Sequence, residues 1–380
     1  MKNILVYAID GVGYGHIARM ANFVNRIADV LDSVNIIFVS GYSNISNFLS
    51  KNDKVDYIKL PSFTRIQTDW KSNEELVKQV EVLRSAILGS ILTIQYFDYI
   101  IIDFFLFGKR DELLTHLKKV RYLYPTTEIL LTFRGIAFSK TKSLKFFKGD
   151  FGVDYLNNVY DKIICFVDKR IIDINKEYFN EKVVIPIDYW GLIGPSPKEK
   201  FEENLDPKRD NRSALNITIN FGGGYNCDKI LISVLYELIK ESNKIINLSI
   251  VLGEYFESKT ILFVKTRFKE FRNIKIYYLA PHKDIYKIKK DVLIGCGGYN
   301  TTVESLMENI PTIIIPKKND RESSIFCSRI AQYSNIKVIK ANQIKYLWET
   351  IEAATKNQNQ CKLDFLDDKN LDNLIKQTFI

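Results

Sequence analysis

The sequence predicts an α/β protein of two Rossmann-like domains that face each other across a cleft. Each half of the chain opens with an apolar strand, a glycine-rich turn and an amphipathic helix, at residues 2–31 and again at 215–242. Continuous apolar runs such as Tyr99–Ile102 are typical of parallel strands that are buried on both faces. A segment rich in charge, Pro and Gly at 191–213 separates the two halves and predicts a linker.

Length and composition agree with this division. A chain of 380 residues is too long for one ordinary core, and 46% hydrophobic with 26% charged residues is a globular composition. We therefore expect an N-terminal acceptor-binding domain at 1–190, the linker at 191–213, and a C-terminal donor-binding domain at 214–380. The last helix is free to pack back on the N-terminal domain.

Composition also limits the class of protein. No stretch of about 18 uncharged apolar residues is present, and the first ten residues read as a strand rather than a signal peptide, so we expect a cytoplasmic protein. Five scattered cysteines and three histidines lack metal-binding spacing, which argues against a disulfide framework and a structural zinc. The net charge of +9 suits an anionic ligand, nucleic acid or an anionic membrane surface. The lysines are dispersed along the chain, so this charge carries little weight.

The periodicity of apolar residues places the elements in order. In the first half we expect strands at 2–9, 35–40, 57–60, 99–103, 128–133 and 162–167, with helices at 17–31, 74–95 and 109–122. In the second half we expect strands at 215–221, 248–253, 274–279, 292–294, 312–315 and 336–339, with helices at 228–242, 259–271 and from 300 or 301 to about 309.

The first glycine turn, Gly11–His16, only superficially matches the dinucleotide fingerprint. Its third glycine falls one position early, and no acidic residue clearly closes the next strand, so a nicotinamide site is disfavoured. Gly13 and Gly15 would instead let a ligand approach His16 at the start of a helix, where the helix dipole favours a neutral imidazole that can act as a base. A purely structural role for this histidine remains the alternative.

Charged residues follow the first-half strands at the edge where open α/β sheets place ligands. Asp103 ends one strand and is a candidate general base or acceptor-binding residue. Arg134 follows the next strand and could pair with an anion, on the ligand or on Asp103 itself. Asp10 is a weaker candidate of the same kind.

The second glycine turn, Gly222, Gly223 and Gly224, opens the C-terminal half. Consecutive unhindered N–H groups at such a turn can cradle a diphosphate. A flexible tight turn without a ligand is the alternative.

The run Leu293–Pro316 combines a strand end, a glycine turn, a helix start and a second strand. The free N–H groups at the helix start suit a phosphate. Thr301 and Glu304 have the T-x-x-E spacing of a capping box, so the glutamate could equally serve its own helix. The candidate ligand-binding residues in this run are Gly297, Gly298, Asn300, Thr301 and Glu304.

Three motifs together resemble a known group of proteins. They are the G-x-G-H turn at Gly13–His16, the D-x-F-x-x-G segment at Asp103–Gly108 and the G-Y-N-T-x-x-E run at Gly298–Glu304. The chain resembles glycosyltransferases of the GT-B type, near the N-acetylglucosaminyltransferase that forms lipid II, over nearly its whole length. This resemblance implies transfer of a sugar from a nucleotide-diphosphate sugar to an acceptor hydroxyl, with a UDP-sugar as the favoured donor.

The resemblance also implies roles for the donor-side residues. Glu304 would bind the ribose diol of the nucleotide-sugar, Thr301 and Gly298 would contact its diphosphate, and the Gly222–Gly224 turn would wrap the other side. Arg321, just before a donor-side helix, would counter phosphate or sugar charge. The chain departs from the family at Ser323 and Ser324, where an acidic residue and a glutamine commonly face the donor sugar, so the usual sugar preference is not implied.

The implied mechanism is inverting and needs no metal or other cofactor, with His16 as the first choice of base and Asp103 as the second. Rival functions are a nucleotide-sugar hydrolase or epimerase, a DNA-modifying glucosyltransferase, and a noncatalytic nucleotide-binding protein. The acceptor is open: a small molecule, a lipid-linked sugar or a polymer, with nucleic acid not favoured. The apolar run Phe104–Phe107 beside Lys109 offers a peripheral membrane contact, although burial in the core is the favoured interpretation.

Overall fold

The chain divides into two compact units. A computed structural model describes residues 1–10, 15–43, 45–63, 74–135, 146–194, 214–240, 246–280, 284–285, 287–318, 320–356, 361–363 and 368–380. The first unit comprises Met1–Ile193 together with Asp364–Ile380, and the second comprises Gly194–Leu363. The first boundary lies close to the expected one at 190. Most of the expected linker falls outside the described residues.

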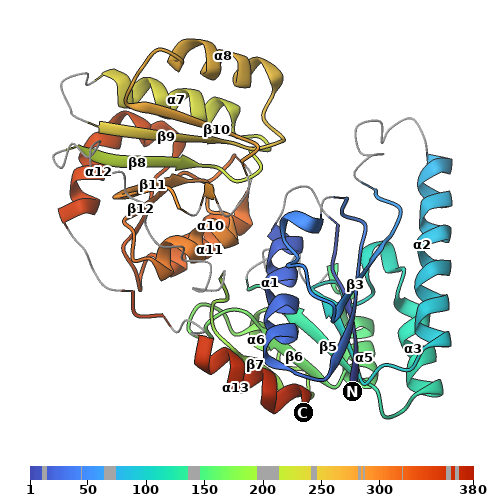
Figure 1. Cartoon of the computed structure of the whole chain (residues 1–380). Coiled ribbons are helices and arrows are strands. Elements are labelled where there is room, and N and C mark those ends of the chain that lie inside the picture. The colour runs from blue at the N-terminus through green and yellow to red at the C-terminus, as the bar shows by residue number, and fades with distance from the viewer. Residues whose placement is uncertain are drawn as a thin grey trace. The chain divides into compact units, whose positions relative to one another are not determined.

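The first unit is a parallel seven-stranded sheet in the order β3-β2-β1-β4-β5-β6-β7. Figure 1 shows its strands between α1 on one face and α2 and α3 on the other. The strands are β1 Lys2–Tyr7, β2 Val34–Ser40, β3 Val55–Lys59, β4 Tyr99–Asp103, β5 Glu128–Phe133, β6 Lys162–Cys165 and β7 Ile187–Tyr189. The helices are α1 Gly15–Val30, α2 Glu74–Ile94, α3 Leu114–Leu123, α5 Gly149–Val159, α6 Ile174–Tyr178 and α13 Asp368–Phe379, with short 3-10 turns η1 Ile45–Asn47 and η3 Lys109–Asp111.

The chain reverses its direction of travel across this sheet at β1. β1 pairs with β2 on one side and with β4 on the other, and Tyr7 lies opposite Ile102. Asp103 in turn lies opposite Thr132 of β5, so the carboxyl ends of these central strands lie at one level. A crevice at such a switch point is where open α/β sheets bind ligands.

The second unit repeats the plan with a parallel six-stranded sheet in the order β10-β9-β8-β11-β12-β13. Its switch point lies between β8 and β11. The glycine turn Gly222–Gly224 follows β8, and the turn with Gly297 and Gly298 follows β11. The strands are β8 Leu215–Asn220, β9 Ile246–Leu252, β10 Ile274–Tyr278, β11 Val292–Gly295, β12 Thr312–Ile314 and β13 Ile336–Val338. The helices are α7 Asp228–Lys240, α8 Ser258–Phe268, α10 Tyr299–Met307, α11 Arg321–Ile330 and α12 Leu347–Lys356, with the 3-10 turn η5 Ala341–Tyr346.

The last helix, α13, belongs to the first unit. It packs on α1, where Arg26 Nε lies 2.6 Å from Asp372 Oδ1. Phe379 places its ring 5.0 Å from Tyr99 and 6.3 Å from Phe23, both in the core of this unit. The C-terminus therefore completes the hydrophobic core of the N-terminal half.

A buried charge network fixes the loops at one end of the first sheet. The Arg84 guanidinium donates from Nε and NH2 to the Glu112 carboxylate at 2.6 and 2.7 Å, and its NH2 lies 3.1 Å from Asp10 Oδ1. Tyr7 also donates to Glu112, and Lys109 Nζ lies 3.5 Å from Asp10 Oδ2. Two carboxylates thus face two cations. Asp10, a weaker candidate base in the sequence analysis, is committed to this network.

The apolar run Phe104–Phe107 after β4 is mostly buried, which is the interpretation that the sequence analysis favoured over a membrane contact. Phe104, Leu106 and Phe107 are between 1 and 4% exposed, which leaves little of this run for contact with a membrane. Among the helices that the structure describes, none is long and apolar enough to cross a membrane.

The network makes a testable contribution to stability. Replacing Arg84 with Met leaves the Glu112 and Asp10 carboxylates buried without their guanidinium, so the variant should lose about 3 to 5 kcal/mol of unfolding free energy in urea titrations. The control is Lys162→Met, which breaks a half-exposed pair with Asp188 and should cost at most about 1 kcal/mol. Equal, small losses in both variants would show that the network does not hold the fold.

Candidate active site

The expected site residues form two clusters, one in each unit. In the first unit His16 lies in the opening turn of α1, Asp103 ends β4 and Arg134 follows β5. Gly15 is the first residue of α1, whereas Gly13 lies outside the described residues. All of the described ones are at the carboxyl edge of the sheet.

Asp103 and His16 are hydrogen-bonded. His16 Nδ1 lies 2.7 Å from Asp103 Oδ2, and Arg19 NH2 donates to the other carboxylate oxygen, Oδ1, at 2.6 Å. Asp103 and Arg19 are 0% and 1% exposed, whereas the His16 side chain is 17% exposed. His16 is therefore the member of this trio that a ligand can reach.

The pKa values of the pair separate the roles of the two residues. Burial lowers the pKa of His16 to about 4; Asp103 opposes this shift, while the charges of Arg134 and Arg19 reinforce it. Burial raises the pKa of Asp103, but His16 and Arg19 outweigh it through charge and hydrogen bonds and hold that pKa at about 2. At neutral pH the site holds an ionised carboxylate beside a neutral imidazole. Because Asp103 accepts from Nδ1–H, Nε2 of that imidazole is left as the proton acceptor.

Asp103 is followed by a strained residue. Phe104 has φ +59°, a left-handed conformation that costs free energy for a bulky side chain. Its amide donates to the Thr132 carbonyl at 2.9 Å, and its ring packs edge-on against Phe133 and Phe147 at 5.4 and 6.0 Å. The aromatic core thus holds the turn that ends β4 and fixes the Asp103 carboxylate.

Arg134 lies over the same aromatic ring. Its guanidinium carbon is 5.7 Å from the Phe104 centroid, and a Cβ added to Gly15 would lie 3.9 Å from its NH1. The positive charge therefore sits near the start of α1. Each Asp103 oxygen accepts a hydrogen bond, one from His16 and the other from Arg19.

The second cluster begins with the glycine turn after β8. Gly222 and Gly224 have φ of +59° and +85°, which only glycine adopts readily. A Cβ on Gly253 would collide with the Gly222 carbonyl, whereas one on Gly222 itself would meet nothing within 4 Å. One side of the turn is thus packed on the loop after β9, and the Cα of Gly222 borders open space.

The helix after β11 starts earlier than expected. α10 begins at Tyr299 with Gly298 as its N-cap, and no side chain caps it. Thr301 is therefore the third helical residue, so the capping-box interpretation of Thr301 and Glu304 is wrong. The early start has a simple cause: Gly298 has φ −63° and ψ 140°, the extended geometry of a cap, and needs no side chain there. The end is as expected, with Asn309 at φ +52°.

The half-buried stripe of α10 carries the predicted donor-side residues. Half-buried positions recur at 300, 301, 304, 307 and 308, whereas Thr302, Val303, Ser305 and Leu306 face the core. Helical spacing places Asn300, Thr301 and Glu304 along one face that begins at the helix start, which no side chain caps.

Gly297, a predicted residue, and Ser323, where the chain departs from the family, both have structural roles here. Gly297 has φ +84°, and a Cβ there would lie 2.7 Å from Cys327 Sγ, so glycine allows α11 to pack against this turn. Ser323 is buried, and its hydroxyl donates to Asp320, the N-cap of α11. Arg321 is the first residue of α11, and its side chain lies outside the described residues.

Sequence reasoning missed Arg19 altogether. The residue lies three positions after His16 and so shares its helix face, but an arginine in an apolar helix was not read as a partner for a strand end. The sequence carried no signal that named it: only the burial of the Arg19 side chain and its contact with Asp103 identify its role.

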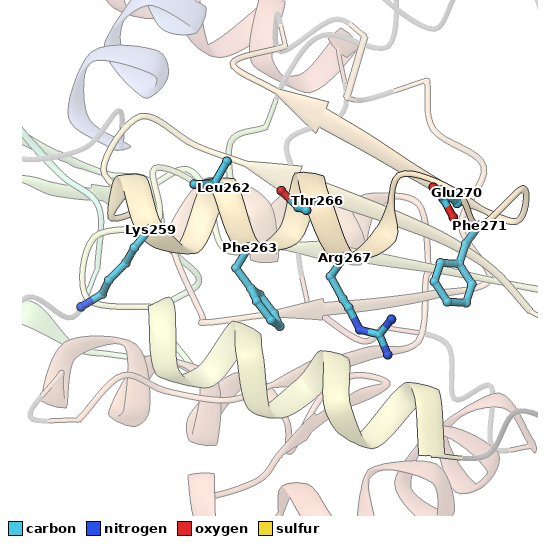
Figure 2. Close-up of a pocket in the computed structure, with 7 residues that line it drawn as sticks. All are labelled: Lys259, Leu262, Phe263, Thr266, Arg267, Glu270 and Phe271. Atoms are coloured by element: carbon cyan, nitrogen blue, oxygen red, sulfur yellow. The ribbon is translucent and has the colours of Figure 1, made fainter.

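A separate cavity of about 750 Å³ lies along α8 in the second unit. Figure 2 shows that its seven labelled lining residues come from α8 and the turn after it, and they include no predicted site residue. Within the described parts of the chain, no group of three or more His, Cys, Asp or Glu side chains is placed to hold a metal ion.

Comparison by sequence finds no relative. No model of a known protein family matches the chain, and no curated protein matches it.

Comparison by structure finds the fold. The chain is similar to Arabidopsis thaliana UGT89C1 complexed with UDP (12% identity, TM-score 0.64, all of both chains) and to the calicheamicin glycosyltransferase CalG4 (11%, 0.62, 99% of this chain and 94% of that one). It is also similar to a candidate UDP-N-acetylglucosamine 2-epimerase from Listeria monocytogenes (9%, 0.62, 99% and 94%). These matches confirm two Rossmann-like α/β domains, the GT-B fold. Identities this low show the fold alone.

The electrostatics of the first cluster can be measured directly. With three histidines in the chain, the ring proton signals can be assigned by substitution, and His16 should titrate near pH 4 instead of near 6.5. Because the folded pKa is depressed, protonation of His16 should destabilise the fold progressively as pH falls from 6.5 to 4. A His16 midpoint at or above 6.5 would contradict the described site.

Proposed function

We propose that the protein is a glycosyltransferase that moves a sugar from a nucleotide-diphosphate sugar, UDP-sugar first, to an acceptor hydroxyl. The observation that carries the proposal is the neutral imidazole of His16, held by an ionised, fully buried carboxylate at the switch point of the first sheet. The fold similarity supports the same chemistry, because UGT89C1 is described with UDP and CalG4 as a glycosyltransferase.

His16 is the base in this proposal. Its Nε2 removes the proton of the acceptor hydroxyl while that oxygen attacks the anomeric carbon, and the bond from this carbon to the diphosphate oxygen breaks, with inversion. Asp103 keeps Nδ1 protonated and stabilises the imidazolium as it forms. Asp103 is the weaker choice of base because both its oxygens are hydrogen-bonded and its side chain is 0% exposed.

The donor site is assigned to the second cluster. The positive end of the α10 dipole, at a helix start that no side chain caps, would stabilise the charge of the leaving diphosphate, so the proposed reaction needs no metal. The Gly222–Gly224 turn would wrap the other side of the donor; its Gly222 and Gly224 amides donate to Asn220 Oδ1 and to the Phe221 carbonyl. Glu304, one turn into α10, would accept hydrogen bonds from the ribose diol. The acceptor-side residues are Gly13, Gly15 and Arg134.

A nucleotide-sugar hydrolase or epimerase is the second candidate, favoured by the likeness to the Listeria protein. It predicts that the donor is consumed without any acceptor. A DNA-modifying glucosyltransferase would require salt-sensitive binding to duplex DNA. A noncatalytic nucleotide-binding protein is the least favoured, since it gives the His16–Asp103 pair no task.

Ligand-induced stabilisation tests the donor site. We expect one or more nucleotide-sugars to raise the melting temperature of the wild type and to lose most of this effect in Glu304→Ala, because the ribose contact is gone. Glu308→Ala is the matched control: it removes a carboxylate at the C-cap of the same helix, paired with Lys290 at 3.3 Å, and should keep the full ligand effect.

The donor assignment fails if a panel of nucleotide-sugars leaves the wild type unshifted, or if Glu304→Ala responds as the wild type does. Donor consumption without acceptor in the active protein would favour the hydrolase or epimerase instead.

A further inference from the structure

The surface around α8 gathers positive charge. From Ser258 at the start of α8 to Lys275 in β10, the chain has six Lys or Arg residues and one acidic residue, Glu270. One of the six, Lys259, pairs with Glu257 at 2.6 Å. The other five are all exposed: Lys265, Arg267, Lys269, Arg272 and Lys275. They outnumber the Glu270 carboxylate, so this surface attracts anionic partners.

The same surface exposes apolar side chains. Leu262 is 67% exposed, and Phe271, in the turn after α8, is 40% exposed. Both line the cavity of about 750 Å³ together with Phe263, Lys259 and Arg267, so apolar and basic groups adjoin one another (Figure 2). Apolar side chains that gather at one exposed place mark an interaction surface, whereas single scattered ones do not.

α8 presents both kinds of side chain on its outer face. Lys259, Leu262, Thr266 and Lys269 recur every three or four residues, so they share one face, and all four are exposed. Val264 and the other buried residues of the helix face the core of the unit. A helix that lies on the surface in this way can place a leucine and two lysines against the same partner.

The surface continues onto β10, which is an edge strand of its sheet. Lys265 Nζ lies 3.7 Å from the centroid of the Tyr278 ring at the end of this strand. Tyr278 and Leu279 are both exposed. Basic and apolar groups therefore alternate over two neighbouring elements.

Among anionic partners, a lipid membrane accounts for both kinds of side chain. Nucleic acid would offer phosphates to the cations but no contact that requires an exposed leucine. An anionic bilayer offers phosphates to Lys and Arg and, directly beneath them, an apolar region for Leu and Phe side chains.

We propose that the surface formed by α8 and β10 docks the protein on an anionic phospholipid membrane, with Leu262 and Phe271 entering the boundary between headgroups and acyl chains. The proposal goes beyond the proposed function and does not depend on it. It assigns a membrane contact to the second unit, in place of the mostly buried run Phe104–Phe107.

Co-sedimentation of the full chain with vesicles tests the proposal. The probes are vesicles of phosphatidylcholine alone and vesicles of equal parts phosphatidylcholine and phosphatidylglycerol. We expect the wild type to bind only the anionic vesicles, and added NaCl to weaken this binding. Each cation near the membrane should strengthen binding about five-fold, so Arg267→Gln combined with Lys269→Gln should weaken it about 25-fold.

Leu262→Gln distinguishes a membrane from other anionic partners. It keeps every charge but removes an apolar side chain from the contact, and it should weaken vesicle binding about ten-fold. The matched control for the charges is Lys337→Gln combined with Lys345→Gln, which removes two exposed cations from β13 and η5 of the same unit. The matched control for the leucine is Val184→Gln, at an 81% exposed side chain of the first unit. Both controls should bind as the wild type does.

Three results would overturn the proposal. The first is a wild type that does not bind the anionic vesicles, and the second is equal binding by the α8 variants and their controls. The third is full binding by Leu262→Gln when the charge variant has lost it, which would assign the surface to nucleic acid or another anion without an apolar layer. The assay contains no nucleotide-sugar, so failure of this proposal is distinguishable from failure of the proposed function.

Discussion

The hydrogen-bonded trio of Asp103, His16 and Arg19 is the constraint on which the first unit's site depends. It joins the end of β4 to the first turn of α1, two elements that the sheet order brings together at the switch point. Burying the Asp103 carboxylate costs desolvation free energy, and the hydrogen bonds to both of its oxygens offset that cost. Removing the carboxylate would leave Arg19 charged and buried, so Asp103 would serve both the stability of the unit and the proposed chemistry.

Much of the fold follows from the sequence because its strands are buried on both faces. Runs such as Tyr99–Asp103 and Leu215–Asn220 have no competing pattern, and the strands are where they were expected. The sequence analysis missed the short elements α6 and β7, and also α5, an 11-residue helix with one buried face. The predicted start of α10 was too late. Thr301 and Glu304 have capping-box spacing and suggested a later cap, whereas the backbone uses Gly298.

The sequence predicted the candidate sites only in part. Strand-end position identified Asp103 and Arg134, and the glycine turn identified His16, but a bond between residues 87 apart depends on how β4 and α1 meet. Arg19 could not be recognised without that contact. Asp10 shows the opposite error. It also follows a strand, but it pairs with Arg84, which in turn donates to the Pro61 carbonyl, so its role is structural.

The most direct test of the account is the protonation pattern of the His16 ring. A long-range ¹H–¹⁵N correlation spectrum of the labelled protein at pH 7 reports which ring nitrogen carries the proton. The account predicts a neutral ring with the proton on Nδ1, facing Asp103, and with a bare Nε2. A proton on Nε2, or a doubly protonated ring at this pH, would contradict the role of His16 as the base.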